Sequence, residues 1–163
     1  MLMFVSALLA FAADRASKIM ILKYAFGLSF PAADKFGESV PLWDGVFNLT
    51  YYGNTGMAFG MFAGNKVMLI CLCAAILAVM IFFAVKFHIK NRLALVSMGM
   101  IIGGAVGNVL DRILYGFVID YFDFCLIDYP IFNVADCFVV VGSVLMCVYV
   151  IFFDKKEDKV GKV

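Results

Sequence analysis

Four long runs of apolar residues divide the chain and predict most of its secondary structure. Val67 to Val85 contains no polar side chain, Leu93 to Leu110 contains no charge, and Phe132 to Phe153 contains only one charged residue. Met1 to Leu22 is the fourth run, and charged residues interrupt it. About 20 apolar residues cross a bilayer core as a helix. The pattern therefore predicts an all-α integral membrane protein with four transmembrane helices in a single domain, residues 1–163. The expected spans are about 1–22, 67–85, 93–110 and 132–153.

The first run is expected to remain in the mature protein as a helix. A cleaved signal peptide starts with a positively charged segment and continues with an unbroken apolar stretch. This chain lacks the positive start, and Asp14 and Arg15 fall where the apolar stretch should continue. We therefore interpret Met1 to Leu22 as a retained span.

Composition and the distribution of basic residues predict the orientation in the membrane. Hydrophobic residues make up 65% of the chain, which excludes a soluble globular domain and a disordered chain. Lysine and arginine mark the cytoplasmic side of membrane proteins. They occupy the connection from Lys86 to Arg92, and the tail after Phe153 adds Lys155, Lys156, Lys159 and Lys162. Both termini are therefore expected in the cytoplasm, and the connections 23–66 and 111–131 on the outer face.

Charged residues in or beside the predicted spans gather at one depth. Asp111 closes the third run and Asp136 opens the fourth, so both are expected at the outer face. At a rise of about 1.5 Å per residue, Asp14 lies about 20 Å along the first helix, in its outer half. Acids in a membrane are costly to desolvate, and they are functional candidates for that reason.

The residue types at the outer face exclude most hydrolytic mechanisms. The chain has a single histidine, His88, in the basic connection, and no H-E-x-x-H, so a zinc hydrolase is excluded. It has no G-x-S-x-G and no C-x-x-C motif. Ser17 and Lys18 are adjacent in a helix and point about 100° apart, which does not suit a Ser-Lys pair. Carboxylates remain as the abundant reactive groups.

Each polar motif also has a purely structural interpretation. Asn133-x-x-Asp136 resembles a helix cap, and Asp14 and Lys18 have the spacing of an ion pair within one helix. Arg112 is expected to neutralise Asp111, because it follows it directly. Gly99, Gly103 and Gly107 form a stripe of small residues typical of helix packing. These interpretations do not account for the convergence of the polar motifs at one membrane depth.

Two carboxyl groups held close together share a proton, so that one activates water and the other protonates a leaving group. Asp120, in GFVIDYFDF, has apolar and aromatic neighbours that are expected to raise its pKa. Asp136, at the start of a helix, is expected to have a lower pKa. Asp120 and Asp136 are therefore the favoured pair. Asp123 and Asp128 are expected to be solvated loop residues.

The sequence resembles bacterial lipoprotein signal peptidase (signal peptidase II) over nearly its whole length. Four motifs occur in order and at the expected membrane depth: DRASK (residues 14–18), NTGMAFG (54–60), GGAVGNVLDRILYGFVIDYFDF (103–124) and FNVAD (132–136). By position, the resemblance implies that Asp120 and Asp136 are the catalytic aspartates. Its supporting polar residues fall on Asp14, Lys18, Asn54, Asn108, Asp111, Arg112 and Asn133. It implies neither a metal nor a cofactor.

The resemblance also implies a substrate, a location and additional structure. The substrate is a diacylglyceryl-modified prolipoprotein, cut just before the lipidated cysteine by a multi-pass enzyme of the bacterial cytoplasmic (inner) membrane. Membrane lipid is an expected partner, and nucleic acid is not. The protein is expected to be a monomer, and globomycin-type inhibitors are expected to bind at the aspartates.

The resemblance also implies a small extracytoplasmic β-sheet cradle and a short outer-face helix or lid. Val46 to Tyr52 suits a strand, with a turn at Gly53-Asn54. Met57 stands where the family usually has a small residue.

Two other classes of protein compete with this interpretation. A proton-coupled membrane transporter or relay uses buried acids, but it predicts broken helices near mid-membrane and an internal repeat. The second span is unbroken, and no repeat beyond the two Asn-x-x-Asp units occurs. A structural assembly factor that packs through the glycine stripe leaves the outer acids unexplained.

Overall fold

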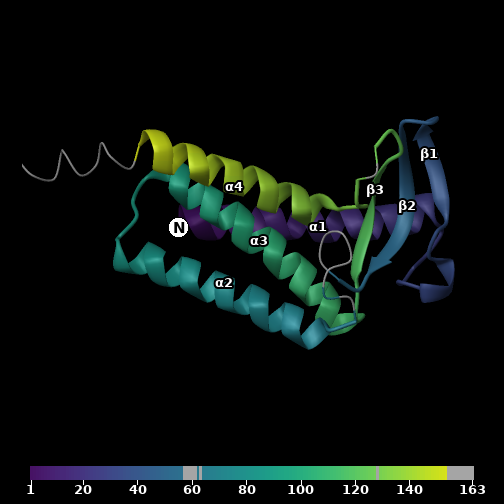
Figure 1. The fold of residues 1–163 in the computed structure, drawn as a ribbon, viewed down its shortest axis with the longest axis horizontal. Coiled ribbons are helices and arrows are strands. Elements are labelled where there is room, and N and C mark those ends of the chain that lie inside the picture. The colour runs from purple at the N-terminus through teal and green to yellow at the C-terminus, as the bar shows by residue number, and fades with distance from the viewer. Residues whose placement is uncertain (57–61, 63, 128, 154–163) are drawn as a thin grey trace, which may run out of the picture.

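The computed structural model describes residues 1–56, 62, 64–127 and 129–153, which form a bundle of helices with a small sheet at one end (Figure 1). Met57, Asp128 and the lysines after Phe153 lie outside the described residues, so the expectations for them are not tested. The helices are α1 (Leu2–Ala25), α2 (Lys66–Lys86), α3 (Arg92–Leu114) and α4 (Val134–Phe152). The strands are β1 (Ser39–Trp43), β2 (Phe47–Asn54) and β3 (Val118–Phe124).

Within the described residues, three helices are long and apolar enough to cross a membrane, namely α2, α3 and α4. Each agrees with a predicted span, and the largest difference is at the end of α3, which continues to Leu114 beyond the expected end at residue 110. Asp111 therefore lies inside the last turn of α3 and does not end it. Helix α1 has 24 residues, but Asp14, Arg15 and Lys18 interrupt its apolar sequence.

Asparagine side chains start three of the helices. Asn65 Oδ1 accepts a hydrogen bond from the amide of Met68, and Asn91 Oδ1 accepts one from the amide of Leu93. Asn133 forms a full capping box at the start of α4. Each cap satisfies amide groups that have no partner within the helix, so these starting points are specified by local sequence.

The three strands form an antiparallel sheet in the order β1-β2-β3. β2 lies in the segment expected to form a strand, but the turn predicted at Gly53-Asn54 is wrong. Both residues continue β2, because they pair with Ile119 and Val118 of β3. In the connection between α1 and α2, the short helical element that the structure describes is a 3₁₀ turn, Ala33–Lys35. A longer outer-face helix stays a prediction.

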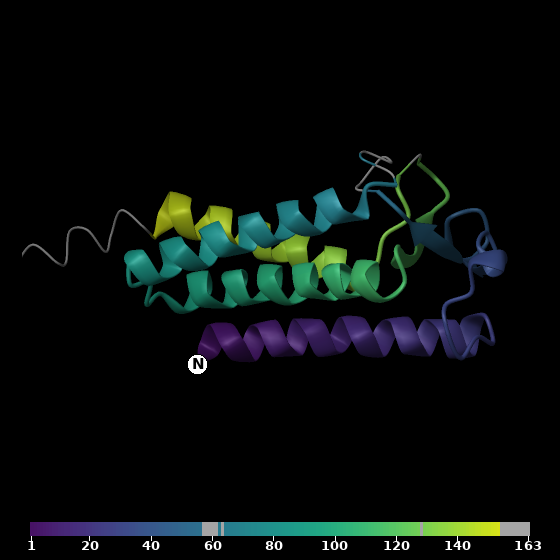
Figure 2. The ribbon, with the colours of Figure 1, turned by 90° about the horizontal axis from the view of Figure 1, so that it is seen from below.

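Small residues bring α3 close to α1 on one side and to α4 on the other (Figure 2). Gly103 lies against the backbone of Ala7, and Gly99 lies against Met3 and Ser6. On the other side, Gly104 faces the carbonyl oxygen of Ala135 in α4. Small residues at helix crossings allow backbones in a membrane to approach closely. The glycine stripe is therefore a packing face, as the spacing indicates.

Helix α2 contacts the bundle much less closely. Its described side chains are largely exposed, with only Leu69 and Ala84 buried. It stands apart from α4 in Figure 1 and from α1 in Figure 2. In contrast, the end of α1 packs firmly on the sheet. Leu22 joins Leu49, Tyr51, Ile119 and Tyr121 in a buried cluster. This cluster places β3 directly above the ends of α1 and α3.

Gly103→Ala tests the close packing of α1 on α3. The added methyl group would lie 2.8 Å from Ala10 Cβ and closer still to the carbonyl oxygen of Ala7, neither of which is the end of a flexible side chain. We expect the variant to lose about 1–3 kcal/mol of stability, as overpacked cores do, measured as thermal unfolding in detergent. Val106→Ala, at an exposed position on the same helix, is the control and should unfold near the wild-type temperature. A Gly103→Ala protein as stable as this control contradicts the packing.

Candidate active site

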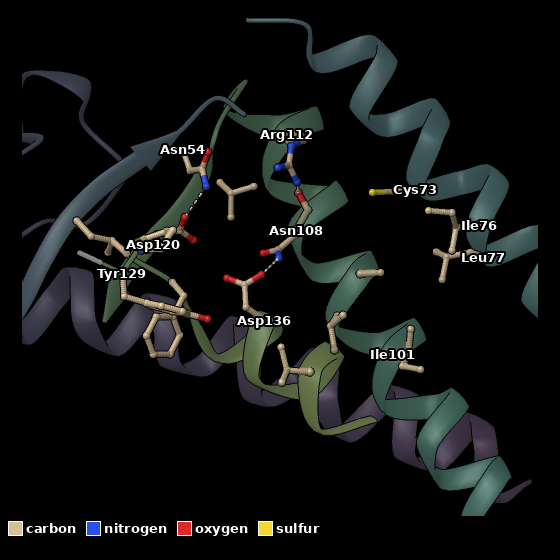
Figure 3. Close-up of a pocket in the computed structure, with 17 residues that line it drawn as sticks. Asn54, Cys73, Ile76, Leu77, Ile101, Asn108, Arg112, Asp120, Tyr129 and Asp136 are labelled. Atoms are coloured by element: carbon tan, nitrogen blue, oxygen red, sulfur yellow. Dashed lines mark hydrogen bonds between the residues drawn. The ribbon is translucent and has the colours of Figure 1, made fainter. Parts of the chain in front are cut away.

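Asp120 lies in the middle of β3 and is 1% exposed. Both of its carboxyl oxygens accept hydrogen bonds from neutral amides. Asn54 Nδ2 donates to Oδ2 at 2.9 Å, and Asn133 Nδ2 donates to Oδ1 at 2.6 Å. Figure 3 shows the Asn54 contact, which joins the end of β2 to Asp120 of β3. The carboxyl group is therefore held in one orientation without a cation against it.

Asp136 lies in the first turn of α4, and its carboxyl group faces the same cavity as that of Asp120 (Figure 3). Its Oδ1 accepts a hydrogen bond from Asn108 Nδ2 at 2.8 Å, and its Oδ2 accepts the backbone amide of Asn133 at 3.1 Å. The bond to Asn133 is half of the capping box. The acid is thus oriented from α3 and from the start of its own helix.

Asn133 serves both as the helix cap and as a link between the two acids. Its Oδ1 accepts the amide of Asp136 at 3.0 Å, which leaves Nδ2 to face Asp120 and the oxygen of Asn108. Because the backbone amide can only donate, the orientation of this side-chain amide is determined. The interpretation of the FNVAD motif as a helix cap is therefore confirmed, and the same asparagine also contacts Asp120.

Burial, and after it the negative charge of Asp136, raise the pKa of Asp120 from its ordinary value to about 8. The hydrogen bonds from Asn54 and Asn133 and the positive charge of Lys18 act in the opposite direction. The sequence-based expectation of a raised pKa is confirmed. At neutral pH the side chain of Asp120 is mainly a neutral acid, which is able to donate a proton.

A buried cluster of two acids and two bases joins α1 to α3 below the sheet. Lys18 Nζ lies 3.0 Å from Asp14 Oδ1 and 2.6 Å from Asp111 Oδ2. Arg15 contacts the same two acids, each at 2.6 Å. Asp14 and Asp111 are fully buried and Lys18 is 2% exposed. The expected Asp14–Lys18 pair is confirmed.

The expected pairing of Asp111 with Arg112 is wrong. Asp111 is neutralised by Lys18 and Arg15 of α1, while Arg112 points elsewhere. Its Nη2 donates to the carbonyl oxygen of Gly56 at 2.6 Å. Neighbouring residues on a helix point in different directions, so sequence adjacency did not indicate contact. Arg112 instead holds the chain that follows β2 against α3.

Three further polar contacts were not anticipated from the sequence. Arg15 belongs to the buried cluster, although the resemblance implies a supporting role only for Asp14 and Lys18 among the residues of α1. The hydroxyl group of Tyr121 donates to Ser17 Oγ at 2.7 Å, which ties β3 to α1. Asp123 accepts a hydrogen bond from Thr50 Oγ1 at 2.6 Å within the sheet, so its expected place in a solvated loop is wrong. The repeated aromatic and aliphatic residues around Asp120 and Asp123 were the available signal for a strand.

The two carboxyl groups open into a cavity of about 380 Å³. Its lining is polar next to the sheet and apolar between the helices. The polar part is formed by Asn54, Asn108, Arg112, Asp120 and Asp136. The apolar part includes Cys73, Ile76, Leu77, Ile101, Val139 and Val140. The cavity therefore suits an amphiphilic molecule, with its polar part at the acids and its apolar part along α2 and α4.

The arrangement is suited to general acid–base chemistry. A neutral acid and a second carboxyl group share one cavity, each held by amide donors. Among the described residues, no group of three or more histidine, cysteine or acidic side chains is arranged to hold a metal ion. The geometry brings together all nine residues that the sequence singled out, in two linked groups. The buried cluster contains Asp14, Lys18 and Asp111. The group around the cavity contains Asn54, Asn108, Arg112, Asp120, Asn133 and Asp136, and Asn108 links it to Lys18.

Comparison with known proteins gives consistent matches over most of the chain. The family model described as Signal peptidase (SPase) II matches residues 6–152. The lipoprotein signal peptidase of Clostridioides difficile (strain 630) is 40% identical over 146 residues, which is 88% of this chain and 90% of that protein. The lipoprotein signal peptidase of Synechocystis sp. (strain PCC 6803) is 43% identical over 129 residues, 79% of each chain. A bacterial membrane enzyme solved by the in meso method superposes with a TM-score of 0.78 at 26% identity, covering 99% of this chain and 91% of that one.

Asp111→Asn tests whether the buried cluster is held together by charge. The change removes one of two negative charges that face two cations away from water. Breaking a buried ion pair costs about 3–5 kcal/mol, so we expect a clearly lower unfolding temperature in detergent and only a partial loss of activity. Asp44→Asn, at an exposed position, is the matched control and should leave stability unchanged. A folded Asp111→Asn protein of wild-type stability without any activity would instead assign Asp111 to the chemistry.

Proposed function

This chain belongs to the signal peptidase II family of aspartic peptidases, and we propose that Asp120 and Asp136 are the catalytic pair with which it cleaves prolipoproteins. The observation that carries the assignment is their common cavity, in which Asp120 is held with a pKa of about 8 beside Asp136. The alternative of a proton-coupled transporter or relay has no support, because the curated relatives are signal peptidases.

In the proposed mechanism, the two acids have different tasks. Asp136, in its ionised form, removes a proton from a water molecule whose oxygen attacks the scissile carbonyl carbon. Asp120, in its neutral form, protonates the amide nitrogen as the carbon–nitrogen bond breaks. The products are the signal peptide, with a new carboxyl group, and the freed amine of the mature lipoprotein. Asp136 then carries the proton taken from water, and its return to Asp120 restores the pair.

The supporting residues orient these two groups. Asn54 and Asn133 position Asp120, while Asn108 positions Asp136. Asn108 is itself held by Lys18, which donates to its oxygen at 3.1 Å. The cluster of Lys18, Asp14 and Asp111 therefore acts on Asp136 through Asn108 rather than on the substrate. Arg112 Nε is buried without a partner among the described residues and lies beside the cavity, so it is available to a carbonyl group of the bound peptide.

We infer that the substrate is the diacylglyceryl-modified form of a prolipoprotein, cut just before the lipidated cysteine. The apolar part of the cavity supports this, because acyl chains match the surface formed by Ile76, Leu77 and Val140. The loose packing of α2 leaves this part accessible from the bilayer. Globomycin-type inhibitors are proposed to occupy the same cavity, with polar groups at the two acids.

We infer that α1 is a fourth span, so that both termini are cytoplasmic and the site faces outward in the bacterial cytoplasmic membrane. Helix α1 runs beside α3 over most of its length (Figure 2). Lys18 pairs with Asp111 of α3 and with Asp14 of its own helix, so these buried charges neutralise one another rather than facing lipid. Lys86, Lys90 and Arg92 lie at the end of the bundle away from the sheet, which is the side expected to be cytoplasmic. The protein is proposed to act as a monomer.

Asp120→Asn and Asp136→Asn test the catalytic pair. Each variant should lose cleavage of a diacylated prolipoprotein peptide by about 10²–10⁴-fold, because asparagine can neither take nor donate the shared proton. Residues that act as one unit are not additive, so the double variant should be barely worse than either single one. Both variants should stay folded and still bind the lipidated peptide. Near-normal turnover by Asp120→Asn, or additive losses in the double variant, contradicts the pair.

Asn54→Ala tests the role of Asp120 as the acid through its pKa. The Asn54 hydrogen bond lowers the pKa of Asp120, so its removal raises that pKa. A neutral Asp120 then persists to higher pH, and the alkaline limb of the profile of kcat/KM against pH should move to higher pH. Asn48→Ala is the matched control, because Asn48 lies on the same strand and makes no hydrogen bond to Asp120 among the described contacts. If the alkaline limb stays in place or moves to lower pH, a group other than Asp120 gives rise to it.

A further inference from the structure

A second cavity, of about 370 Å³, lies on the opposite side of α3 from the two acids. We name it the α1–α3 groove. Helix α3 contributes Leu110 and Leu114 to the groove, whereas Asn108 and Arg112 line the active-site cavity. Residues two apart on a helix point about 200° apart, so the two cavities occupy opposite faces of α3. The groove is therefore separate from the site of peptide cleavage.

The α1–α3 groove combines an apolar wall with cations at the level where the helices end. Ile19, Leu110 and Leu114 form part of its wall, and Ile19 and Leu114 are largely exposed. Lys23 lies in the last turn of α1 and Leu114 is the last residue of α3. In a membrane enzyme the ends of spanning helices lie at the boundary between acyl chains and headgroups. The groove therefore extends from the acyl region to the headgroup region on the sheet side.

Two cations at the groove have capacity to bind an anion. Arg15 uses four of its five N–H groups on Asp14, Asp111 and the carbonyl oxygen of Gly107, which leaves one N–H group of Nη1 without a partner among the described residues. Lys23 takes part in none of the ion pairs found among the described residues, and its ammonium lies over the Tyr24 ring. The negative charges of Asp14 and Asp111 balance the positive charges of Arg15 and Lys18. The charge of Lys23 is therefore the one positive charge of the lining that remains uncompensated.

We propose that the α1–α3 groove binds an anionic phospholipid of the surrounding leaflet. The phosphate of the headgroup contacts Lys23 and the remaining N–H group of Arg15, while an acyl chain follows Ile19, Leu110 and Leu114. The charge of the groove favours an anionic headgroup over a zwitterionic one. Its continuity with the lipid-facing surface of α1 and α3 favours a lipid over a soluble anion. This lipid differs from the lipidated substrate, because it occupies the other face of α3.

Lipid-selective fluorescence quenching tests the proposal in the full-length protein. Phe30 lines the groove and is largely exposed, so Phe30→Trp with Trp43→Phe places the only tryptophan of the chain there. The protein is placed in nanodiscs with acyl-brominated phosphatidylglycerol or phosphatidylcholine at equal mole fraction. Attraction of one basic residue to anionic lipid predicts roughly a fivefold preference for phosphatidylglycerol. Equal quenching by the two lipids overturns the proposal.

Charge variants then assign the preference to the groove. Lys23→Gln in the reporter protein should remove most of it, and Lys23→Arg should retain it, which also shows that the site is folded. Lys35→Gln is the matched control, because Lys35 is an exposed lysine outside the groove that pairs with Glu38. Loss of the preference in both glutamine variants indicates only general surface charge and overturns a specific site. Displacement of the brominated lipid by inorganic phosphate indicates a soluble anion and also overturns the proposal.

Discussion

The buried polar contacts between α1 and α3 depend on the ammonium group of Lys18. It can donate three hydrogen bonds, and it donates to three residues: Asp14 on its own helix, and Asn108 and Asp111 on α3. Away from water an ammonium group of this kind is tolerated only with opposite charge around it. Two carboxylates meet this need and also bind Arg15, so the charges in the cluster balance. The contact between α1 and α3 is thereby specified in register as well as in position.

The order imposed by Lys18 extends to the two acids of the cavity. Lys18 holds the oxygen of Asn108, so the amide nitrogen of Asn108 must face Asp136. Asp111 also accepts the backbone amide of Ile119 at 3.3 Å, and Asn133 donates to the carbonyl oxygen of the same residue at 3.2 Å. The peptide groups on either side of Ile119 are therefore held from α3 and from α4. Asp120 follows directly and is positioned by a backbone that cannot shift without breaking these contacts.

This arrangement separates the buried ion pairs from the two acids that are proposed to be catalytic. The cations lie around Asp14 and Asp111, while Asp120 receives only neutral amide donors. A lysine in direct contact would hold Asp120 in its ionised form and remove its capacity to donate a proton. The distribution of cations, rather than the number of acids, is what distinguishes the acids that serve the structure from those that face the cavity.

The helices were predictable because lipid imposes a simple requirement for long apolar runs, which residues 67–85, 93–110 and 132–153 meet. The cap at Asn133 and the packing of the glycine stripe were also visible in local spacing. Strands β1 and β3 were not visible in local spacing, because a three-stranded sheet depends on pairing between distant segments. Pro41 in β1 and two acids in β3 also weaken the local signal for a strand. The partner of Asp111 was assigned incorrectly for a similar reason. Contact between Arg15, Lys18 and Asp111 arises only when Gly99, Gly103 and Gly107 bring α1 against α3.

Asp120 is proposed to carry a proton at neutral pH while Asp136 lies beside it. Infrared difference spectroscopy between the wild-type protein and Asp120→Asn, recorded as a function of pH in a native-like bilayer, measures that proton through the carbonyl stretch of a neutral carboxyl group. We expect a band that is present at pH 7, is absent from the variant and is half lost near pH 8, since the pKa of Asp120 is raised to about 8. A spectrum in which Asp120 is already ionised at pH 6 would contradict the raised pKa.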